Sequence, residues 1–289
     1  MLNKIILGTA QLGMKYGINN YGSLSKNQSF NILDFAFENK IEYLDIAESY
    51  GNIIELLGLY FKEKPQNKFK IFSKLNLNDI YAINHIKTHI TNQLNKMNVK
   101  SIYGYMFHSY SELVKFPKVL ESLQELKEDG VINKIGVSLY ENSEAISVLD
   151  NFDLDFIQLP FNLLDNQSQK ENIFEIYKKK KIEIHARSIF LQGLFFKPYS
   201  KYESQLKPLI PYMKEIDRIV KKSKSNLDTM AINYPLKKEY IDKVIFGVHN
   251  LSQFKRNIDS IGSDLKLDCK EIEMVIVKEK ELLKPLNWR

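Results

Sequence analysis

Short apolar runs alternate with longer amphipathic stretches along almost the whole chain. Runs of roughly four to six apolar residues are typical of buried strands, and stretches of roughly ten to eighteen residues with one apolar face are typical of helices. Their alternation is the pattern of βα units around a parallel sheet. The runs that predict strands are Ile5–Thr9, Tyr43–Ile46, Ile71–Lys74, Tyr103–His108, Lys134–Ser138, Phe156–Leu159, Ile182–Ala186 and Val244–Gly247.

Amphipathic stretches fill the gaps between these runs and continue after the last one. Ser25 and Ser111 are expected to cap two of the resulting helices, and Gly130 after Asp129 is expected to end one. The stretches predict helices near residues 26–39, 52–63, 80–97, 112–128, 143–149, 168–180, 208–223, 251–261 and 268–283.

Eight strands, each followed by a helix, predict a single (β/α)8 TIM barrel with an extra C-terminal helix. No Gly/Ser-rich linker or long charged block divides the chain, so residues 1–289 are expected to form one domain. An open doubly wound sheet usually carries a glycine-rich turn after its first strand, and the segment from Gly8 to Gly13 does not fit G-x-G-x-x-G. The aperiodic segment 193–211 is expected to be a loop at the barrel mouth.

The composition fits such a barrel and raises one question through its charge. The chain is 289 residues long, 44% hydrophobic and 26% charged, as in globular proteins and unlike disordered ones. A formal net charge of +6 invites a nucleic-acid or membrane-surface partner. Arginine, the residue that reads bases and clamps phosphates, is scarce, and the densest lysine run, 178–181, ends an amphipathic stretch. We therefore expect no nucleic acid and no membrane among the partners.

Cysteine usage and the N-terminus indicate a cytoplasmic protein. Cys269 is the only cysteine, which excludes a disulfide framework and a cysteine-based metal site and suits a reducing compartment. The apolar run near Met1 is too short for a signal sequence, and no run of roughly 18 apolar residues could span a bilayer.

Four ionisable residues lie at or after the ends of neighbouring predicted strands. Asp45 lies in the second run, Tyr50 follows it, Lys74 ends the third and His108 ends the fourth. Each alone has a structural explanation: a helix cap, a lysine reaching for solvent, or a core histidine. In a (β/α)8 barrel, however, the reacting groups project from the carboxyl ends of the strands, where these four would converge.

Together the four residues make a coherent acid. A lysine beside a phenol favours the phenolate and is expected to lower the pKa of Tyr50, while Asp45 keeps Lys74 charged and fixed. His108 could orient a carbonyl group. This set suits protonation of an oxygen while a hydride reaches the adjoining carbon.

The same residues carry a resemblance to a known family. The segment from Asp45 to Gly58, with its Tyr50-Gly51 pair, resembles the Asp…Tyr-Gly-x-x-Glu-x-x-Leu-Gly motif of the aldo-keto reductases, and Lys74 and His108 match the family's lysine and histidine. Further matches run in order to about residue 260. They are 123–130, Ile135 to Ser138, Gln158 with 161–164, Ala186 to Ser188 with Gln192 to Leu194, and Gly247 with Gln253 and Asn257.

The resemblance implies a barrel that binds a nicotinamide dinucleotide without a Rossmann motif or a metal. It makes Tyr50 the general acid, Lys74 and Asp45 the groups that tune it, and His108 the group that orients the substrate. It assigns Gly8, Thr9, Ala10, Ser138 and Gln158 to the nicotinamide. It assigns Ser188, Gln192 and Gly193 to the pyrophosphate, and the segment from Gly247 to Asn257, with His249, Gln253 and Arg256, to the adenosine phosphate.

Three departures from the family pattern carry information. Arg187 stands where many members have a tyrosine that stacks on the nicotinamide, so it could stack there or bind an anionic group. Leu139 replaces a usual asparagine after Ser138. Arg256, with His249 and Lys255 nearby, replaces a glutamate, and this favours NADPH as cofactor, with NADH as the alternative.

The expected activity is reduction of a small-molecule aldehyde or ketone. Gln11, Tyr16, Tyr50, His108 and the loop 190–202 are the candidate substrate contacts, and Tyr16-Gly17-Ile18 is similar to family members from surface-polysaccharide pathways, which suggests a keto-sugar or sugar-derived substrate. Two alternatives stay open: a nucleotide-binding redox sensor or docking subunit with slow turnover, and a lyase or aldolase with a Schiff base on Lys74. The oligomeric state and the physiological direction stay open as well.

Overall fold

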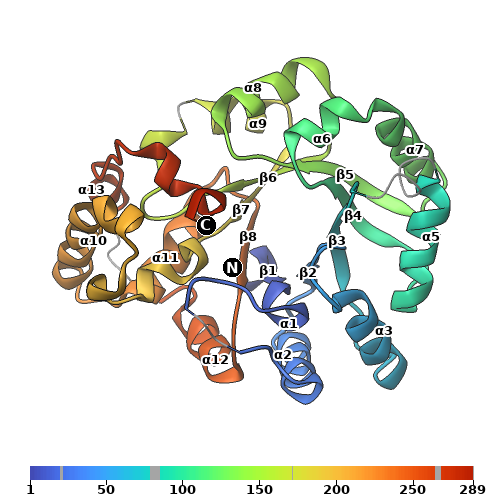
Figure 1. Ribbon diagram of the computed structural model, residues 1–289, viewed down its shortest axis with the longest axis horizontal. Coiled ribbons are helices and arrows are strands. Elements are labelled where there is room, and N and C mark those ends of the chain that lie inside the picture. Colours follow the sequence, from blue (N-terminus) through green and yellow to red (C-terminus); the bar gives the residue numbers. More distant parts are fainter. Residues whose placement is uncertain (20–21, 79–84, 171, 264–267, 289) are drawn as a thin grey trace.

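Eight parallel strands close into a barrel in chain order, which confirms the predicted fold (Figure 1). The computed structural model describes residues 1–19, 22–78, 85–170, 172–263 and 268–288. Every predicted strand is present, with its ends within two residues of the expected positions. The strands are β1 Ile5–Gly8, β2 Tyr43–Asp45, β3 Lys70–Lys74, β4 Ile102–Phe107, β5 Ile132–Ser138, β6 Phe156–Pro160, β7 Glu183–Arg187 and β8 Lys243–Gly247.

Helices cover the outside of the barrel (Figure 1). They are α2 Lys26–Glu38, α3 Ile53–Glu63, α5 Ile86–Met97, α6 Tyr110–Lys115, α7 Pro117–Glu128, α8 Asn142–Asn151, α9 Ile173–Lys179, α10 Ile210–Lys222, α11 Leu227–Leu236 and α12 Leu251–Ser260. The short α1 Ala10–Gly13 and α13 Cys269–Glu273 complete the set. The first residues of the predicted helix 80–97 lie outside the described ranges. Within those ranges, no helix has both the length and the apolar character needed to cross a bilayer.

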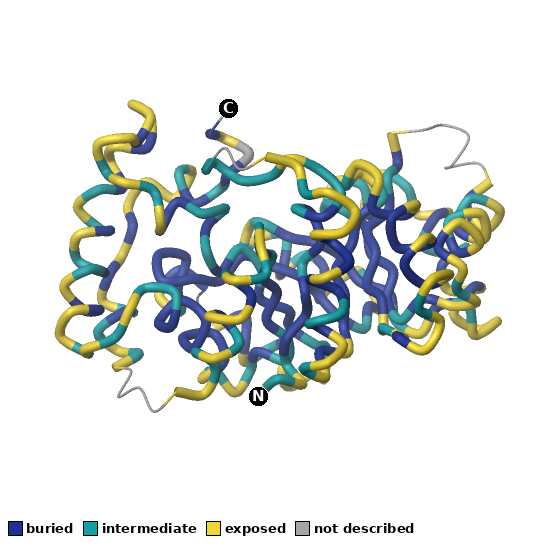
Figure 2. Tube along the Cα trace, turned by 90° about the horizontal axis from the view of Figure 1, so that it is seen from below, coloured by how far each residue is buried: buried dark blue, intermediate teal, exposed yellow. Residues whose placement is uncertain are grey.

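Two apolar cores hold the barrel together, one between the strands and the helices and one inside the barrel. Figure 2 shows the buried centre and the exposed outer faces of the helices. The inner core is made of Ile6, Tyr43, Phe72, Met106, Phe156 and Ile245. Because successive side chains of a strand point to opposite faces, the residue two positions later points inward again.

The next inward positions lie at the carboxyl ends of the strands, and we call them the top layer. They are Gly8, Asp45, Lys74, His108, Ser138, Gln158, Arg187 and Gly247. Strand register aligns Gly8 with both Asp45 and Gly247, and Ser138 with Gln158. Asp45 pairs instead with Phe72, and Lys74 with Met106, so the layer is staggered where the tilted strands shift register. The top layer therefore faces the barrel mouth, directly above an apolar interior.

The predicted caps are right at one helix and wrong at another. Ser25 caps α2 and forms a capping box with Gln28, as expected. Ser109, not Ser111, caps the helix after β4 by accepting a hydrogen bond from the backbone of Glu112. The single helix expected over 112–128 is divided at Phe116, because Pro117 lacks the N–H that a continuing helix would need and instead starts α7.

Helix α11 is absent from the sequence-based expectation. Its residues from Thr229 to Leu236 are all buried, since the helix packs against β8, α10 and α12. A helix that is buried all round shows no amphipathic period, so the hydrophobic pattern did not reveal it. Asn226 caps it through a hydrogen bond from the backbone of Thr229.

The C-terminal helix expected over 268–283 ends after its first turns. From Met274 to Val277 exposed and buried residues alternate, as in an extended segment, and short turns at Lys280–Leu283 and Pro285–Trp288 follow. Buried side-chain amides donate hydrogen bonds to carbonyl groups that would accept from the backbone if the helix continued. Asn166 donates to the carbonyls of Ile272 and Val275 at 2.9 Å each, and Gln169 donates to that of Val277.

We predict that Asn166→Ala lowers the free energy of unfolding by about 2 kcal/mol, because it leaves buried carbonyls without donors. The measurement is thermal or urea unfolding, with limited proteolysis to detect release of residues 268–288. Asn151→Ala is the control, since Asn151 makes one exposed hydrogen bond to Ser147 on α8 and should change stability by less than about 0.5 kcal/mol. Equal stability of the two variants would contradict this account of the C-terminal segment.

Candidate active site

A cavity of about 430 Å³ opens at the carboxyl ends of the strands. All predicted site residues line this cavity. They are Gly8, Thr9, Ala10, Gln11, Tyr16, Asp45, Tyr50, Lys74, His108, Ser138, Gln158, Arg187, Ser188, Gln192, Gly193, Gly247, His249, Gln253, Arg256 and Asn257. The structure thus brings residues from all eight strand ends and several loops around one space.

A buried ion pair forms the floor of the cavity. Lys74 Nζ lies 2.5 Å from Asp45 Oδ1 and 3.3 Å from the carbonyl oxygen of Ile46. Gln158 donates from Nε2 to the second Asp45 oxygen at 2.7 Å. Burial lowers the pKa of Lys74, and the charge and hydrogen bond of Asp45 oppose that shift. The almost fully buried lysine is therefore fixed by two oxygens, and Gln158 in turn fixes Asp45.

Close backbone packing positions Tyr50 over this pair. The loop between β2 and α3 crosses α1, where the backbone N–H of Asn52 donates to the Gly13 carbonyl at 3.2 Å. A methyl group on Gly13 would overlap the carbonyl oxygen of Tyr50, and Gly51 has a φ of +58°, which side chains disfavour. Glycine at both positions lets the loop carrying the phenol approach the barrel.

The environment of Tyr50 corrects one expectation. Lys74 Nζ lies 5.2 Å from the centre of the Tyr50 ring. Burial raises the pKa of Tyr50 above its ordinary value, the charge of Asp45 raises it further, and Arg187 lowers it. The expected net lowering of the Tyr50 pKa is therefore wrong, because burial of the hydroxyl has the largest effect. Tyr50 is thus a phenol that keeps its proton, which an acid must do before it reacts.

His108 faces Tyr50 across the cavity. The two ring centres are 6.4 Å apart and the rings are nearly perpendicular. The backbone N–H of His108 donates to the Glu112 carboxylate at 3.0 Å, which fixes the start of the loop after β4. Burial, and then the charges of Lys74 and Arg187, lower the pKa of His108 to about 4. The imidazole is therefore neutral at pH 7 and can donate a hydrogen bond without carrying a charge.

The cavity has unfilled hydrogen-bonding capacity beside the ion pair. Gln158 Oε1 is buried and has no partner among the described residues. In the loop after β7, three residues adopt left-handed backbone conformations with φ between 46° and 57°: Ser188, Leu191 and Gln192. Such strained geometry clusters at ligand sites. An unpaired acceptor and a strained loop fit a polar ligand such as a nicotinamide carboxamide. Among the described residues, no group of three His, Cys, Asp or Glu side chains could hold a metal.

Helix α12 borders the other part of the cavity. His249, Gln253, Arg256 and Asn257 line it, and the backbone of His249 is tied to Gln253 Oε1 at 2.9 Å. Arg256 bonds only to the hydroxyl of Ser252 among the described residues, so its charge is available to an anion. Lys255 does not line the cavity, and its ammonium lies 5.8 Å from the centre of the Phe35 ring. The structure therefore places Arg256, but not Lys255, beside the cavity.

Several lining residues escaped the sequence analysis. They are Asn19, Tyr140, Ile189, Asp228, Ile245 and Phe246, whereas Phe190 and Phe196 belong to the loop 190–202 that the sequence analysis named. Tyr140 could have been found, because it lies two positions after Ser138 and so continues the inward side of β5. Asn19 comes from a loop without periodicity. Asp228 belongs to the unpredicted helix α11.

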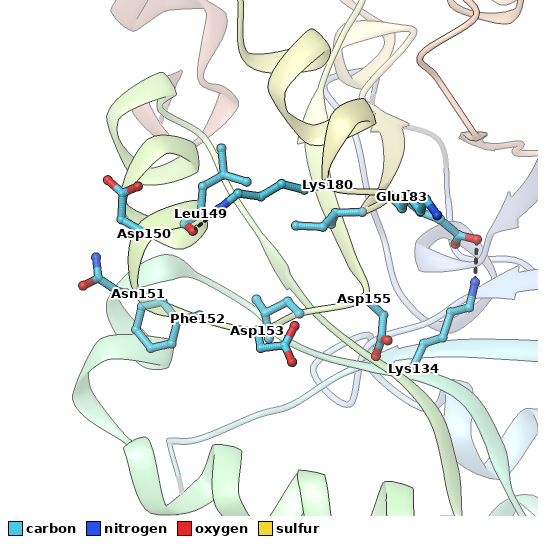
Figure 3. Close-up of a pocket in the computed structure, with 12 residues that line it drawn as sticks. Lys134, Leu149, Asp150, Asn151, Phe152, Asp153, Asp155, Lys180 and Glu183 are labelled. Carbon is cyan, nitrogen blue, oxygen red and sulfur yellow. Dashed lines mark hydrogen bonds and ion pairs between the residues drawn. The ribbon is translucent and has the colours of Figure 1, made fainter.

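A second hollow lies at the opposite end of the barrel, by the amino ends of β5, β6 and β7 (Figure 3). Four of its charged groups have partners: Lys134 pairs with Glu183 at 2.5 Å, Asp155 pairs with Lys127, and Lys180 donates to the Leu149 carbonyl. Catalytic groups of such barrels lie at the other end of the strands. The first cavity is therefore the candidate active site.

Comparisons with known proteins agree with this geometry. A sequence model of the Aldo/keto reductase family matches residues 4–278. The uncharacterised oxidoreductase YqkF of Bacillus subtilis is 23% identical over 91% of this chain and 92% of that protein. The NADH-specific methylglyoxal reductase of Escherichia coli is 22% identical over 91% of each chain. In structure, the aldo-keto reductase AKR11C1 from Bacillus halodurans, in its holo form, superposes with a TM-score of 0.75 at 19% identity, covering 96% of this chain and 94% of that chain.

We predict that His108 stays neutral well below the usual range for histidine. Because its pKa is about 4 in the folded protein and near 6.5 when unfolded, the unfolded chain binds more protons between these values, and stability falls as pH drops through that window. NMR of the imidazole nitrogens of the ligand-free protein should show no titration of His108 between pH 8 and about pH 5. Titration near pH 6.5 would contradict the buried position described here.

Proposed function

The chain belongs to the aldo/keto reductase family of NAD(P)H-dependent carbonyl reductases, and we propose that it uses NADPH and that Tyr50 is its proton donor. The observation that carries the proposal is the grouping of Tyr50, His108 and the Lys74–Asp45 pair at the end of adjacent strands, beside one cavity. This grouping supports reduction of an aldehyde or ketone to an alcohol.

Each side chain has a definable part in the reaction. The bound nicotinamide supplies the hydride that the carbonyl carbon receives. Neutral His108 donates a hydrogen bond to the carbonyl oxygen and so orients and polarises it. Tyr50 transfers its phenolic proton to that oxygen as the C=O π bond becomes a C–H and an O–H bond. The phenolate left behind is stabilised by Lys74 and Arg187, and a proton from solvent restores it.

The residues that would hold the cofactor fall into three groups. The unpaired Gln158 Oε1 would accept a hydrogen bond from the carboxamide of the nicotinamide. The strained loop at Ser188 would bind the phosphates. Arg256, with His249, supports the choice of NADPH, because a guanidinium fits a phosphate oxygen pair. The remaining contacts are proposed for Gly8, Thr9, Ala10, Ser138, Gln192, Gly193, Gly247, Gln253 and Asn257.

The substrate side of the cavity is polar. Gln11, Tyr16, Asn19 and Tyr140 line it with amides and phenols. Gln192 donates to the Tyr16 hydroxyl at 3.2 Å, which leaves the Tyr16 proton free for a ligand. Such a lining suits a hydroxylated carbonyl compound, and we propose a keto-sugar or sugar-derived substrate.

Tyr50→Phe tests the proton donor. Because it removes only a hydroxyl, we expect cofactor affinity within about threefold of the wild type and a rate of carbonyl reduction lower by about 10²- to 10⁴-fold. NADPH binding by fluorescence and NADPH oxidation with an aldehyde panel provide the readouts. Tyr212→Phe, which alters a phenol on the outer helix α10, is the control and should keep full activity. Retained turnover in Tyr50→Phe would overturn the assignment.

Arg256→Met tests the cofactor preference, and the same substitution at the neighbouring Lys255 is the control. We expect KM for NADPH to rise about tenfold or more, while KM for NADH changes little, because only NADPH carries the extra phosphate. Lys255→Met changes a cation one residue away that points to Phe35, and it should leave both KM values unchanged. Equal losses with both cofactors, or a wild-type preference for NADH, would refute the proposed role of Arg256.

A further inference from the structure

Arg187 is fixed at the reacting end of the cavity. It is the last residue of β7, and its guanidinium carbon lies 4.2 Å from the centre of the Tyr140 ring. Nη2 donates to the Leu139 carbonyl at 3.0 Å and Nη1 to the Ser188 hydroxyl at 3.2 Å. Stacking on one face and two hydrogen bonds at the edge hold the plane of the guanidinium in one orientation.

The charge of Arg187 reaches the groups that surround the reacting atoms. It lowers the pKa of Tyr50, Tyr16 and His108, each of which lines the same cavity. These effects require the guanidinium to lie near all three side chains. Arg187 therefore belongs to the part of the cavity where the carbonyl group would be reduced.

That charge has no counter-ion among the described residues. Lys74 is neutralised by Asp45, and Asp165, which acts on Arg187 from a distance, is paired with buried Lys170 at 2.7 Å. No carboxylate lies within ion-pair distance of Arg187 in the described part of the chain. A partly buried, unpaired cation is costly, and the cost is recovered when an anion binds.

We propose that Arg187 binds a carboxylate on the substrate, so that the preferred substrates are carbonyl acids. The idea rests on the proposed carbonyl reduction and adds the class of substrate to it. A guanidinium edge matches the two oxygens of a carboxylate, and each terminal nitrogen has an N–H left after its protein bond. One unmatched positive charge suits a monoanion better than a phosphate dianion. The stacked Tyr140 fixes the direction from which that carboxylate approaches.

The wild-type protein provides the first test, with substrate pairs that differ in charge but hardly in size. Glyoxylate is compared with methylglyoxal, and succinic semialdehyde with butyraldehyde, by steady-state oxidation of NADPH. We expect kcat/KM to be about tenfold or more higher for at least one acid than for its neutral partner, mainly through KM. A preference for the neutral member of both pairs would overturn the proposal, and it requires no variant that might fail to fold.

The Arg187→Met variant then tests whether Arg187 causes the preference for the acid. Because only the acid loses an ion pair, we expect kcat/KM for the preferred acid to fall about 10- to 100-fold further than that for its neutral partner, while Arg187→Lys recovers part of this difference. Arg218→Met, on the outer helix α10, is the matched control and should change neither. NADPH affinity is measured by fluorescence in each variant.

The possible failures are distinguishable. Equal losses for acid and neutral substrates, with weaker NADPH binding, would assign Arg187 to the cofactor and overturn the proposal while leaving carbonyl reduction intact. Absence of turnover with every aldehyde and ketone, despite NADPH binding, would instead contradict the proposed function itself.

Discussion

A lysine and an aspartate share the floor of a barrel from which water is almost excluded. Neither Lys74 nor Asp45 could be buried alone, because an unpaired charge in this environment would cost about 3–5 kcal/mol. The pair is stable because both Asp45 oxygens accept hydrogen bonds, one from Lys74 and the other from Gln158. The same arrangement fixes the Gln158 amide with its carbonyl oxygen unpaired and gives Tyr50 a cation close to its ring. The proposed cofactor contact and the proposed proton transfer thus both depend on one ion pair.

Much of this site follows from the two-residue period of the strands. An apolar inward residue such as Tyr43 or Phe72 is followed two positions later by Asp45 or Lys74, so the sequence alone indicates which polar groups face the barrel mouth. The same rule predicts the inward direction of Gln158 and Arg187. Family resemblance added their expected roles, which the pattern could not provide.

The remaining features depend on tertiary contacts that leave no periodic signal. Helix α11 is buried on every side, and the end of α13 is decided by Asn166, which lies more than a hundred residues earlier in the chain. The pKa of Tyr50 is raised mainly by burial and then by the charge of Asp45, and sequence spacing supplies neither the burial nor the distance between the two groups. Lys255 and Arg256 are neighbours in sequence but point to different surroundings, so charge counting could not separate them.

The position of Lys74 also bears on the alternative chemistry of a Schiff base. Its nitrogen is held by Asp45 and by the Ile46 carbonyl and is almost fully buried, so a substrate carbonyl would have to displace these partners to form a Schiff base. Transfer of deuterium distinguishes the two mechanisms most directly. The protein is incubated with a carbonyl acid and with NADPH in which both hydrogens on the reactive nicotinamide carbon are deuterium, and the product is analysed by NMR and mass spectrometry. Our account predicts one deuterium on the former carbonyl carbon of an alcohol product; product formation without deuterium at that carbon would contradict it.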